Sequence, residues 1–483
     1  MTQSPTAAEA RYRMLETIRV FAAEGCAGEP ALRDAHARYF LRLAERAEPY
    51  LRGRDQLPWL ARLDADRDDL DAAMGLLTAT DPAAALRLMA TLTWFRRLRG
   101  LHGEQLPQAR ALLAAVGDEP PGGPTEEYAL CLMNSVAGRG DDPGEAARVA
   151  RAVALMRSLD RPLRLPFTVV VWSLTGGPLL AADEQVRVQV GEEPWGHALL
   201  DLGLAYQELY AGRATAAEAS FARSLEGFRA TGDRWGMANC LDPLALFADG
   251  RGDHARAIEL LDEGLAYVRE LEAPEEIADL LRSRATVLLH RGDAEEAAAH
   301  FTRSAALART AGVPDKVAGA RRGLGDVARL SGDTTHARVH YESGLELCTA
   351  TWFSTSETVR LLVGLGLTAA TEGQVETARE WFEQARTPAL ESFDVLALAD
   401  LADALASVAP RPERAAELLG AAAGLRGTVL LGDPDVVRTL NDVRARLSAQ
   451  AYDTAFERGR SRRSAAVGEP PAVGEPRGSV GGR

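Results

Sequence analysis

Several residue types that would support a metal-binding, secreted or membrane protein are scarce in this chain of 483 residues. The four cysteines are well separated along the sequence and include no CxxC pair, so neither a zinc site nor a disulfide framework is expected. Aromatic residues make up only 6% of the chain and β-branched runs are short, which argues against an extensive β-sheet. No apolar run approaches the roughly 18 to 20 residues of a membrane span, and the N-terminus has no signal-peptide core. We therefore expect a cytoplasmic protein without membrane association.

Lysine is almost absent, and the single lysine is not part of a phosphate-binding loop. Lys316 lies between Asp315 and Val317, whereas a P-loop needs glycines before its lysine and Ser or Thr after it. The formal net charge of −14 also repels a phosphate backbone. We expect neither ATP hydrolysis nor direct, specific DNA binding by this chain.

No catalytic or metal-binding arrangement stands out from the sequence. His336 and His340 have the i, i+4 spacing of a zinc-binding helix, but Ala337 occupies the place of the general-base glutamate. Gly364 and Gly366 lack the third glycine and the preceding strand of a dinucleotide-binding loop. The sequence therefore predicts that the chain is not an enzyme and has no catalytic residues, no cofactor and no metal site.

The chain does contain an internal repeat with a period of about 40 residues. Glycines recur at Gly212, Gly252, Gly292, Gly332 and Gly373, at intervals of 40, 40, 40 and 41 residues. An aspartate follows the second, third and fourth of these glycines. We expect each glycine to adopt the left-handed conformation at the end of one helix, and each aspartate to cap the next helix.

Small and large residues keep fixed distances from these turn glycines. An alanine lies five residues after each glycine, at Ala217, Ala257, Ala297, Ala337 and Ala378. Four residues further on lie the bulky Phe221, Leu261, Phe301, Tyr341 and Phe382, and three beyond them the small Ser224, Gly264, Ser304, Gly344 and Ala385. Small residues also lie seven positions before the glycines, at Ala205, Ala245, Ala285, Gly325 and Gly366.

This alternation of small and large residues is typical of both helices of a tetratricopeptide repeat, although a period of 40 also falls in the range of HEAT repeats. The pattern favours tetratricopeptide packing with slightly lengthened helices. The predicted fold is all-α: a tetratricopeptide-repeat superhelix, or α-solenoid, with an N-terminal helical segment.

Changes in composition divide the chain into five regions. The predicted regions are an N-terminal helical region (1–116), degenerate helical repeats (126–200), the regular repeat array (201–427), C-terminal capping helices (428–457) and a disordered tail (458–483).

In this register the first helix of each hairpin faces the concave side of the superhelix. Eight polar residues are predicted to line that groove: Asn239, Asp242, Asp279, Arg282, Arg322, Asp326, Arg329 and Arg360. Stacked arginines with a few carboxylates can hold a partner protein or a small anionic effector through charge-assisted hydrogen bonds. They can equally form ion pairs between repeats, which contribute little individually. The sequence leaves both alternatives open.

Several segments also resemble one family of regulators. Residues 11–22, RYRMLETIRVFA, are similar to the RYRLLETIREYA segment that ends the ATPase module of AfsR-like regulators of the antibiotic regulatory protein (SARP) family and of related LuxR-type ATP-binding regulators. The similarity continues at residues 36–41, at 231–238 (TGDRWGMA) and at 416–423 (AELLGAAA). One departure is Asp69, where the family commonly has asparagine.

This resemblance implies a transcriptional regulator in which an ATPase precedes a repeat sensor, with a DNA-binding domain elsewhere in the full-length protein. Residues 1–116 would then resemble the end of the ATPase module and its helical connector, as in a shortened or split regulator. The resulting hypothesis is a regulatory module that binds a protein or an effector and can form homo-oligomers. The alternative is a free-standing tetratricopeptide scaffold or adaptor without a transcriptional role.

Overall fold

The computed structural model describes residues 30–117, 125–136, 144–176, 184–348, 352–392 and 394–468, and within these ranges the chain forms helices and no strand. The predicted all-α fold is confirmed. None of the described helices has the combination of length and apolar character that a membrane span requires. Residues 11–22, which carry much of the family resemblance, lie outside the described ranges.

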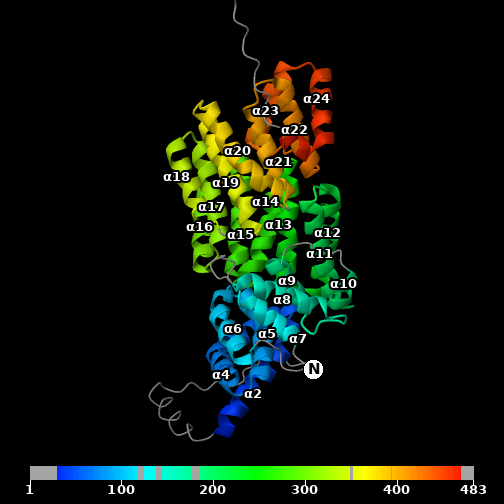
Figure 1. The fold of residues 1–483 in the computed structure, drawn as a ribbon, viewed down its shortest axis with the longest axis vertical. Helices are drawn as coiled ribbons and strands as arrows, with labels where there is room; N and C mark the ends of the chain where they lie inside the picture. The colour runs from blue at the N-terminus through cyan, green and yellow to red at the C-terminus, as the bar shows by residue number, and fades with distance from the viewer. Residues whose placement is uncertain are drawn as a thin grey trace, which may run out of the picture.

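The N-terminal helices form a group at one end of the elongated molecule (Figure 1). They are α2 (Pro30–Ala47), the 3-10 helix η1 (Glu48–Arg52), α3 (Gln56–Ala65), α4 (Arg67–Thr80), α5 (Pro82–Leu98) and α6 (His102–Val116). The Trp94 ring of α5 stacks on Phe167 and meets Trp195 and Trp235 edge-on. Because aromatic rings bury a large apolar area, this cluster joins the N-terminal group to the repeats.

Four shorter helices lead into the repeats. They are α7 (Thr125–Asn134), α8 (Glu145–Arg157), α9 (Thr168–Gly176) and α10 (Glu184–Val190). The one β-branched run of the sequence, residues 167–172, lies almost entirely within α9, and Val169, Val171 and Trp172 are buried. Burial of this short apolar helix outweighs the β-propensity of its residues.

From residue 194 the described chain forms successive antiparallel hairpins of about 40 residues that stack into a curved spiral (Figure 1). The hairpins are α11 (Pro194–Tyr210) with α12 (Ala214–Thr231), α13 (Arg234–Gly250) with α14 (His254–Glu270), α15 (Pro274–Arg291) with α16 (Ala294–Thr310), α17 (Pro314–Leu330) with α18 (Thr334–Leu345), α19 (Trp352–Thr371) with α20 (Val375–Glu391), and α21 (Val395–Ser407) with α22 (Pro412–Arg426).

The packing predicted from the residue spacing is confirmed. The alanines after the turn glycines are 0% exposed, and the bulky residues that follow them are at most 1% exposed. A Cβ atom on Gly325 would lie 2.6 Å from the Tyr341 ring, and one on Gly366 would lie 2.2 Å from the Phe382 ring. Glycine is needed at these two positions because the bulky residue of the same hairpin already fills the space.

The turns follow the expected geometry with one exception. All five turn glycines have positive φ, between 71° and 101°. Asp253 and Asp333 each accept a backbone N–H bond of 3.1 Å from the residue three positions on, so they cap the next helix. The prediction is wrong for Asp293, whose carboxylate binds the Arg291 guanidinium and makes no capping bond. Arg291 competes for this carboxylate. The equivalent Arg251 donates instead to Glu218 at 2.9 and 3.0 Å, and the position two residues before Asp333 is Ser331.

Three helices follow the repeats: α23 (Pro434–Arg446), α24 (Ala449–Arg462) and α25 (Ser464–Gly468). The prediction of a disordered tail is wrong for residues 458–468, which are almost entirely helical. Ala466 and Val467 are buried, and their carbonyl oxygens accept bonds of 2.6 Å from Arg414 and Arg386 of the repeats. These tertiary contacts order a segment whose Arg-rich and Ser-rich composition suggested disorder. Residues 469–483 lie outside the described ranges.

Candidate binding cavity

One turn of the spiral brings the end of the repeat array back to its beginning. The backbone N–H of Leu431 donates to the carbonyl oxygen of Gly250 at 2.8 Å. A Cβ atom on Gly212 would lie 1.7 Å from the carbonyl oxygen of Leu425, so the two backbones can approach only because residue 212 is glycine. We call residues 427–446, which include α23, the C-terminal strap. The strap closes the spiral against its first hairpins.

The spiral and the strap enclose a cavity of about 1290 Å³. Its walls come mainly from the first helices of the hairpins, together with α9 and the strap. All eight residues predicted to face the groove line this cavity: Asn239, Asp242, Asp279, Arg282, Arg322, Asp326, Arg329 and Arg360. The volume exceeds the roughly 300 to 1,000 Å³ of a typical small-molecule pocket, so the cavity has room for a peptide segment.

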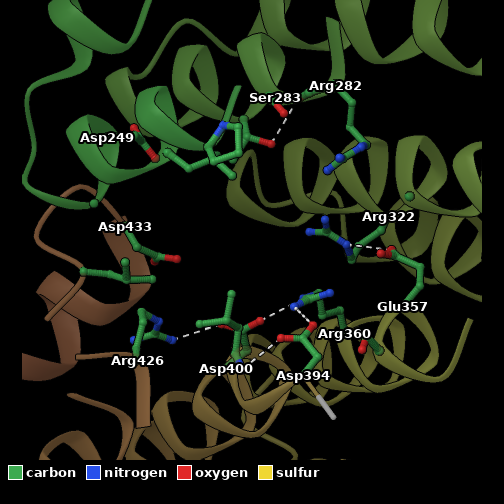
Figure 2. A pocket seen from close by; sticks show the side chains of 18 of the residues that line it. Asp249, Arg282, Ser283, Arg322, Glu357, Arg360, Asp394, Asp400, Arg426 and Asp433 are labelled. Atoms are coloured by element: carbon green, nitrogen blue, oxygen red, sulfur yellow. Dashed lines mark hydrogen bonds and ion pairs between the residues drawn. The ribbon is translucent and has the colours of Figure 1, made fainter. Parts of the chain in front are cut away.

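Two of the predicted arginines make ion pairs between neighbouring hairpins (Figure 2). The Arg322 Nε atom donates to Glu357 at 2.8 Å. Arg360 donates to Asp394 at 2.8 Å and to Asp400 at 2.9 Å. Despite its burial, the Glu357 carboxyl has a lowered pKa because Arg322, Arg360 and Arg282 surround it.

Three further basic side chains in the cavity are also paired. Arg329 binds Asp435 of the strap through both terminal nitrogens, at 3.2 and 2.6 Å. Arg426 donates to Asp400 and to Asp403 at 3.0 Å each. Lys316 binds Asp279 at 2.6 Å and lies 3.3 Å from Glu275. An anionic ligand would have to compete with these carboxylates for every one of these cations.

Arg282 differs from the other predicted arginines. Within the described residues its guanidinium makes no hydrogen bond and no ion pair, and its side chain projects into the cavity on the same side as Arg322 (Figure 2). It is the predicted arginine that an anionic group can reach without displacing a carboxylate.

Two carboxylates on the cavity wall are incompletely satisfied. Oδ1 of Asp242 and Oε2 of Glu276 are buried and have no hydrogen-bond partner among the described residues. The other oxygen of Glu276 accepts a bond of 3.1 Å from the indole N–H of Trp235. Burial raises the pKa of Asp242 to about 6, and the positive charge of Arg282 and the neighbouring Ser283 hydroxyl oppose this only in part. Burial and the neighbouring Glu275 also raise the pKa of Glu276.

Two histidines share one carboxylate where the first hairpins meet the strap. The Nδ1 atoms of His254 and His290 lie 2.9 and 2.8 Å from the two oxygens of Asp249. Burial disfavours the protonated form of His290, but the bond to Asp249 and the nearby Asp433 outweigh it and raise its pKa. The end of α13 is thereby joined to the start of α14 and the end of α15.

Further charged residues line the cavity beyond the eight predicted from the sequence. The charged residues that were not predicted are Arg97, Asp249, Glu275, Glu276, Asp315, Lys316, Glu357, Asp394, Asp400, Asp403, Arg426, Asp433, Asp435, Arg438, Asp442 and Arg446. Glu357 could have been found, because it lies three residues before Arg360 and so shares its helix face. The strap residues carry no repeat register, and Arg97 comes from α5 of the N-terminal group, outside the repeat array.

The tetratricopeptide repeat family model matches residues 276–350, which cover most of α15 to α18. No curated protein matches the chain.

Parts of the chain are similar to three solved structures. A Rap protein complexed with the competence and sporulation factor is 12% identical, over 80% of this chain and 99% of that one, with a TM-score of 0.43. The apo form of RapI is 13% identical over 75% of this chain and 96% of its own, with a TM-score of 0.34. BtubC from P. vanneervenii is 17% identical over 41% of this chain and 83% of its own, also with a TM-score of 0.34.

Proposed function

We propose that this chain is an interaction module that binds a segment of a partner protein inside the cavity formed by its repeats and the C-terminal strap. The observation that carries this proposal is the cavity of about 1290 Å³, which is larger than a small metabolite needs and contains polar groups from successive hairpins. Tetratricopeptide repeats generally mediate binding between proteins, and the family match at residues 276–350 supports such a role here. Nothing in the described part of the chain supports catalysis.

We further propose that the module is regulatory and belongs to a transcriptional regulator of the SARP or LuxR type. The support is the sequence resemblance at residues 11–22, 231–238 and 416–423. In this proposal the cavity is the sensor, and an ATPase and a DNA-binding domain are supplied outside this chain. A free-standing scaffold with the same cavity is the alternative, and the two differ in whether the captured partner carries an ATPase or a DNA-binding domain.

A small anionic effector is a second candidate ligand. The observation that favours it is the unpaired guanidinium of Arg282 beside Arg322 (Figure 2). Charge-assisted bonds from a guanidinium to a carboxylate or phosphate are strong and directional.

The binding proposal can be tested by filling the cavity. Thr286 lines the cavity and its hydroxyl donates to the carbonyl oxygen of Arg282 at 3.1 Å. Thr302, on the outer helix of the same hairpin, is exposed and makes the equivalent bond to Ala298 at 2.8 Å. Thr286→Trp and Thr302→Trp therefore remove the same bond and add the same side chain, but only the first occupies the cavity.

Affinity capture from the native cell extract, followed by mass spectrometry, should recover a partner with the wild type and with Thr302→Trp. The Thr286→Trp variant should lose at least nine-tenths of that partner while keeping its helical circular dichroism. Equal capture by all three proteins would place the binding surface outside the cavity and overturn the proposal.

A further inference from the structure

The charges that line the cavity are not balanced. Among the described residues, fourteen carboxyl groups line it against nine lysine and arginine side chains and His290, whose pKa is raised. The carboxylates are Asp242, Asp249, Glu275, Glu276, Asp279, Asp315, Asp326, Glu357, Asp394, Asp400, Asp403, Asp433, Asp435 and Asp442. The basic side chains are Arg97, Arg282, Lys316, Arg322, Arg329, Arg360, Arg426, Arg438 and Arg446. In a partly open cavity with protein walls of low dielectric constant, this excess produces a negative potential that attracts cations.

Intramolecular pairing leaves this imbalance unchanged, because each pair neutralises one charge of each sign. Arg322, Arg329, Arg360, Arg426 and Lys316 are each held within 3.0 Å of at least one carboxylate of the same cavity. Their positive charge is largely neutralised before any ligand arrives. The negative charge left over includes two buried oxygens that no described residue satisfies, Oδ1 of Asp242 and Oε2 of Glu276.

These two carboxylates share one region of the wall with aromatic rings. Trp235, which bonds Glu276, lies on α13 two helical turns before Asp242, a rise of roughly 10 Å. Tyr206 of α11 also lines this region, and its hydroxyl is close enough to Asp242 to feel its charge. Aromatic side chains beside carboxylates are a favourable environment for an ammonium or guanidinium group.

From this juxtaposition we infer that the cavity selects a positively charged ligand, with the wall formed by Tyr206, Trp235, Asp242 and Glu276 receiving its ammonium or guanidinium groups. The inference rests on the proposed binding function and specifies the chemistry of the bound segment. The ligand is a lysine-containing or arginine-containing stretch of a partner protein, and a free polyamine is the small-molecule source of the same chemistry.

Arg282 provides the sharpest test, because it is a cation that faces the same space. If the ligand is cationic, Arg282→Gln removes a repulsion and should tighten binding about threefold to tenfold. If the ligand is anionic, the same change removes its unpaired anchor and should weaken binding. The two chemistries therefore predict effects of opposite sign for one substitution.

The probe is a display library of random octapeptides, selected on the full chain and counter-selected on Thr286→Trp. Peptides retained by the cavity should contain more Lys and Arg than Asp and Glu. An individual retained peptide should bind about tenfold more weakly to Asp242→Asn and to Glu276→Gln, and should weaken as sodium chloride is raised from 50 to 500 mM. Asp262→Asn is the matched control, because Asp262 lies on the outer helix α14 and is 54% exposed.

The outcomes separate the two proposals. Retained peptides rich in Asp and Glu, or weaker binding by Arg282→Gln, would overturn the cation inference while keeping the cavity as the binding site. Failure to retain any peptide, together with capture that is unchanged in Thr286→Trp, would overturn both. Calorimetry with spermidine tests the small-molecule source. If spermidine binds as tightly as the best peptide and binds Asp242→Asn more weakly, the same chemistry is supported with a free polyamine as the ligand.

Discussion

Asp242 is a carboxylate that the free protein leaves poorly stabilised. One of its oxygens has no hydrogen-bond partner among the described residues, and burial raises its pKa to about 6. Between the pKa of about 4 in the unfolded chain and the raised value in the fold, the folded state retains a proton that the unfolded state releases. The free energy of unfolding therefore falls as pH rises through this window. Such a cost is expected at a residue retained for binding.

The first prediction follows from that sign. Asp242→Asn should raise the free energy of unfolding by about 2 to 3 kcal/mol at pH 8, because it removes a buried charge, and should change it little at pH 4. Urea denaturation followed by circular dichroism at both pH values measures the difference. Asp262→Asn serves as the control and should stay within about 1 kcal/mol of wild type at both pH values, since it affects only an exposed ion pair. A destabilising effect of Asp242→Asn at pH 8 would contradict this account.

At the scale of elements, glycines at equivalent turns of the repeat have different structural roles. Gly212 and Gly332 occupy equivalent repeat positions with φ of 71° and 85°. At Gly332 nothing lies within 4 Å of where a Cβ atom would be, so this glycine serves the turn alone. At Gly212 the Cβ atom would lie 1.7 Å from the carbonyl oxygen of Leu425, so this glycine also allows the end of α22 to pack directly against the turn. The closure of the spiral depends on this second role.

The matched pair Gly212→Ala and Gly332→Ala separates turn strain from closure. Gly332→Ala should cost about 1 to 2 kcal/mol of stability, the strain of a left-handed residue with a Cβ atom. Gly212→Ala should cost about 1 to 3 kcal/mol more, because two backbones must move apart. Hydrogen exchange followed by mass spectrometry should show faster exchange across residues 427–446 in Gly212→Ala only. Equal exchange in the two variants would mean that the strap does not depend on this contact.

At the scale of the whole molecule, closure converts the concave repeat surface into a partly open acidic cavity. The strap contributes Asp433 and Asp435 to its wall, and the bidentate pair between Asp435 and Arg329 connects the strap to α17. The net charge of −14 and the intramolecular pairing of the arginines both disfavour a phosphate backbone.

The corresponding prediction concerns ATP hydrolysis and DNA binding, which we propose are carried out by domains outside this chain. The purified chain should hydrolyse ATP no faster than a buffer blank and should form no sequence-specific complex with duplex DNA at 150 mM salt. A phosphate-release assay and a gel shift with unlabelled competitor DNA measure these two properties. A specific complex that survives competitor would show that the chain binds DNA directly and would overturn this part of the proposal.

The sequence alone determined the repeat. A small residue such as Ala297 and a bulky one such as Phe301 must recur at fixed offsets wherever identical hairpins stack, so local spacing predicted the all-α spiral and its concave face. It also predicted that eight polar residues would share one groove, and all eight line the cavity. Their part in binding stays a prediction.

Only the tertiary structure decided which of these residues are paired and what closes the groove. Arg329 and Asp435 lie 106 residues apart, and no local pattern links them. The accumulated rotation of stacked hairpins brings the strap to the first turns, and that rotation depends on packing along the whole array. Burial, partner choice and the resulting shift in the pKa of Asp242 follow from that closure, which the residue spacing does not specify.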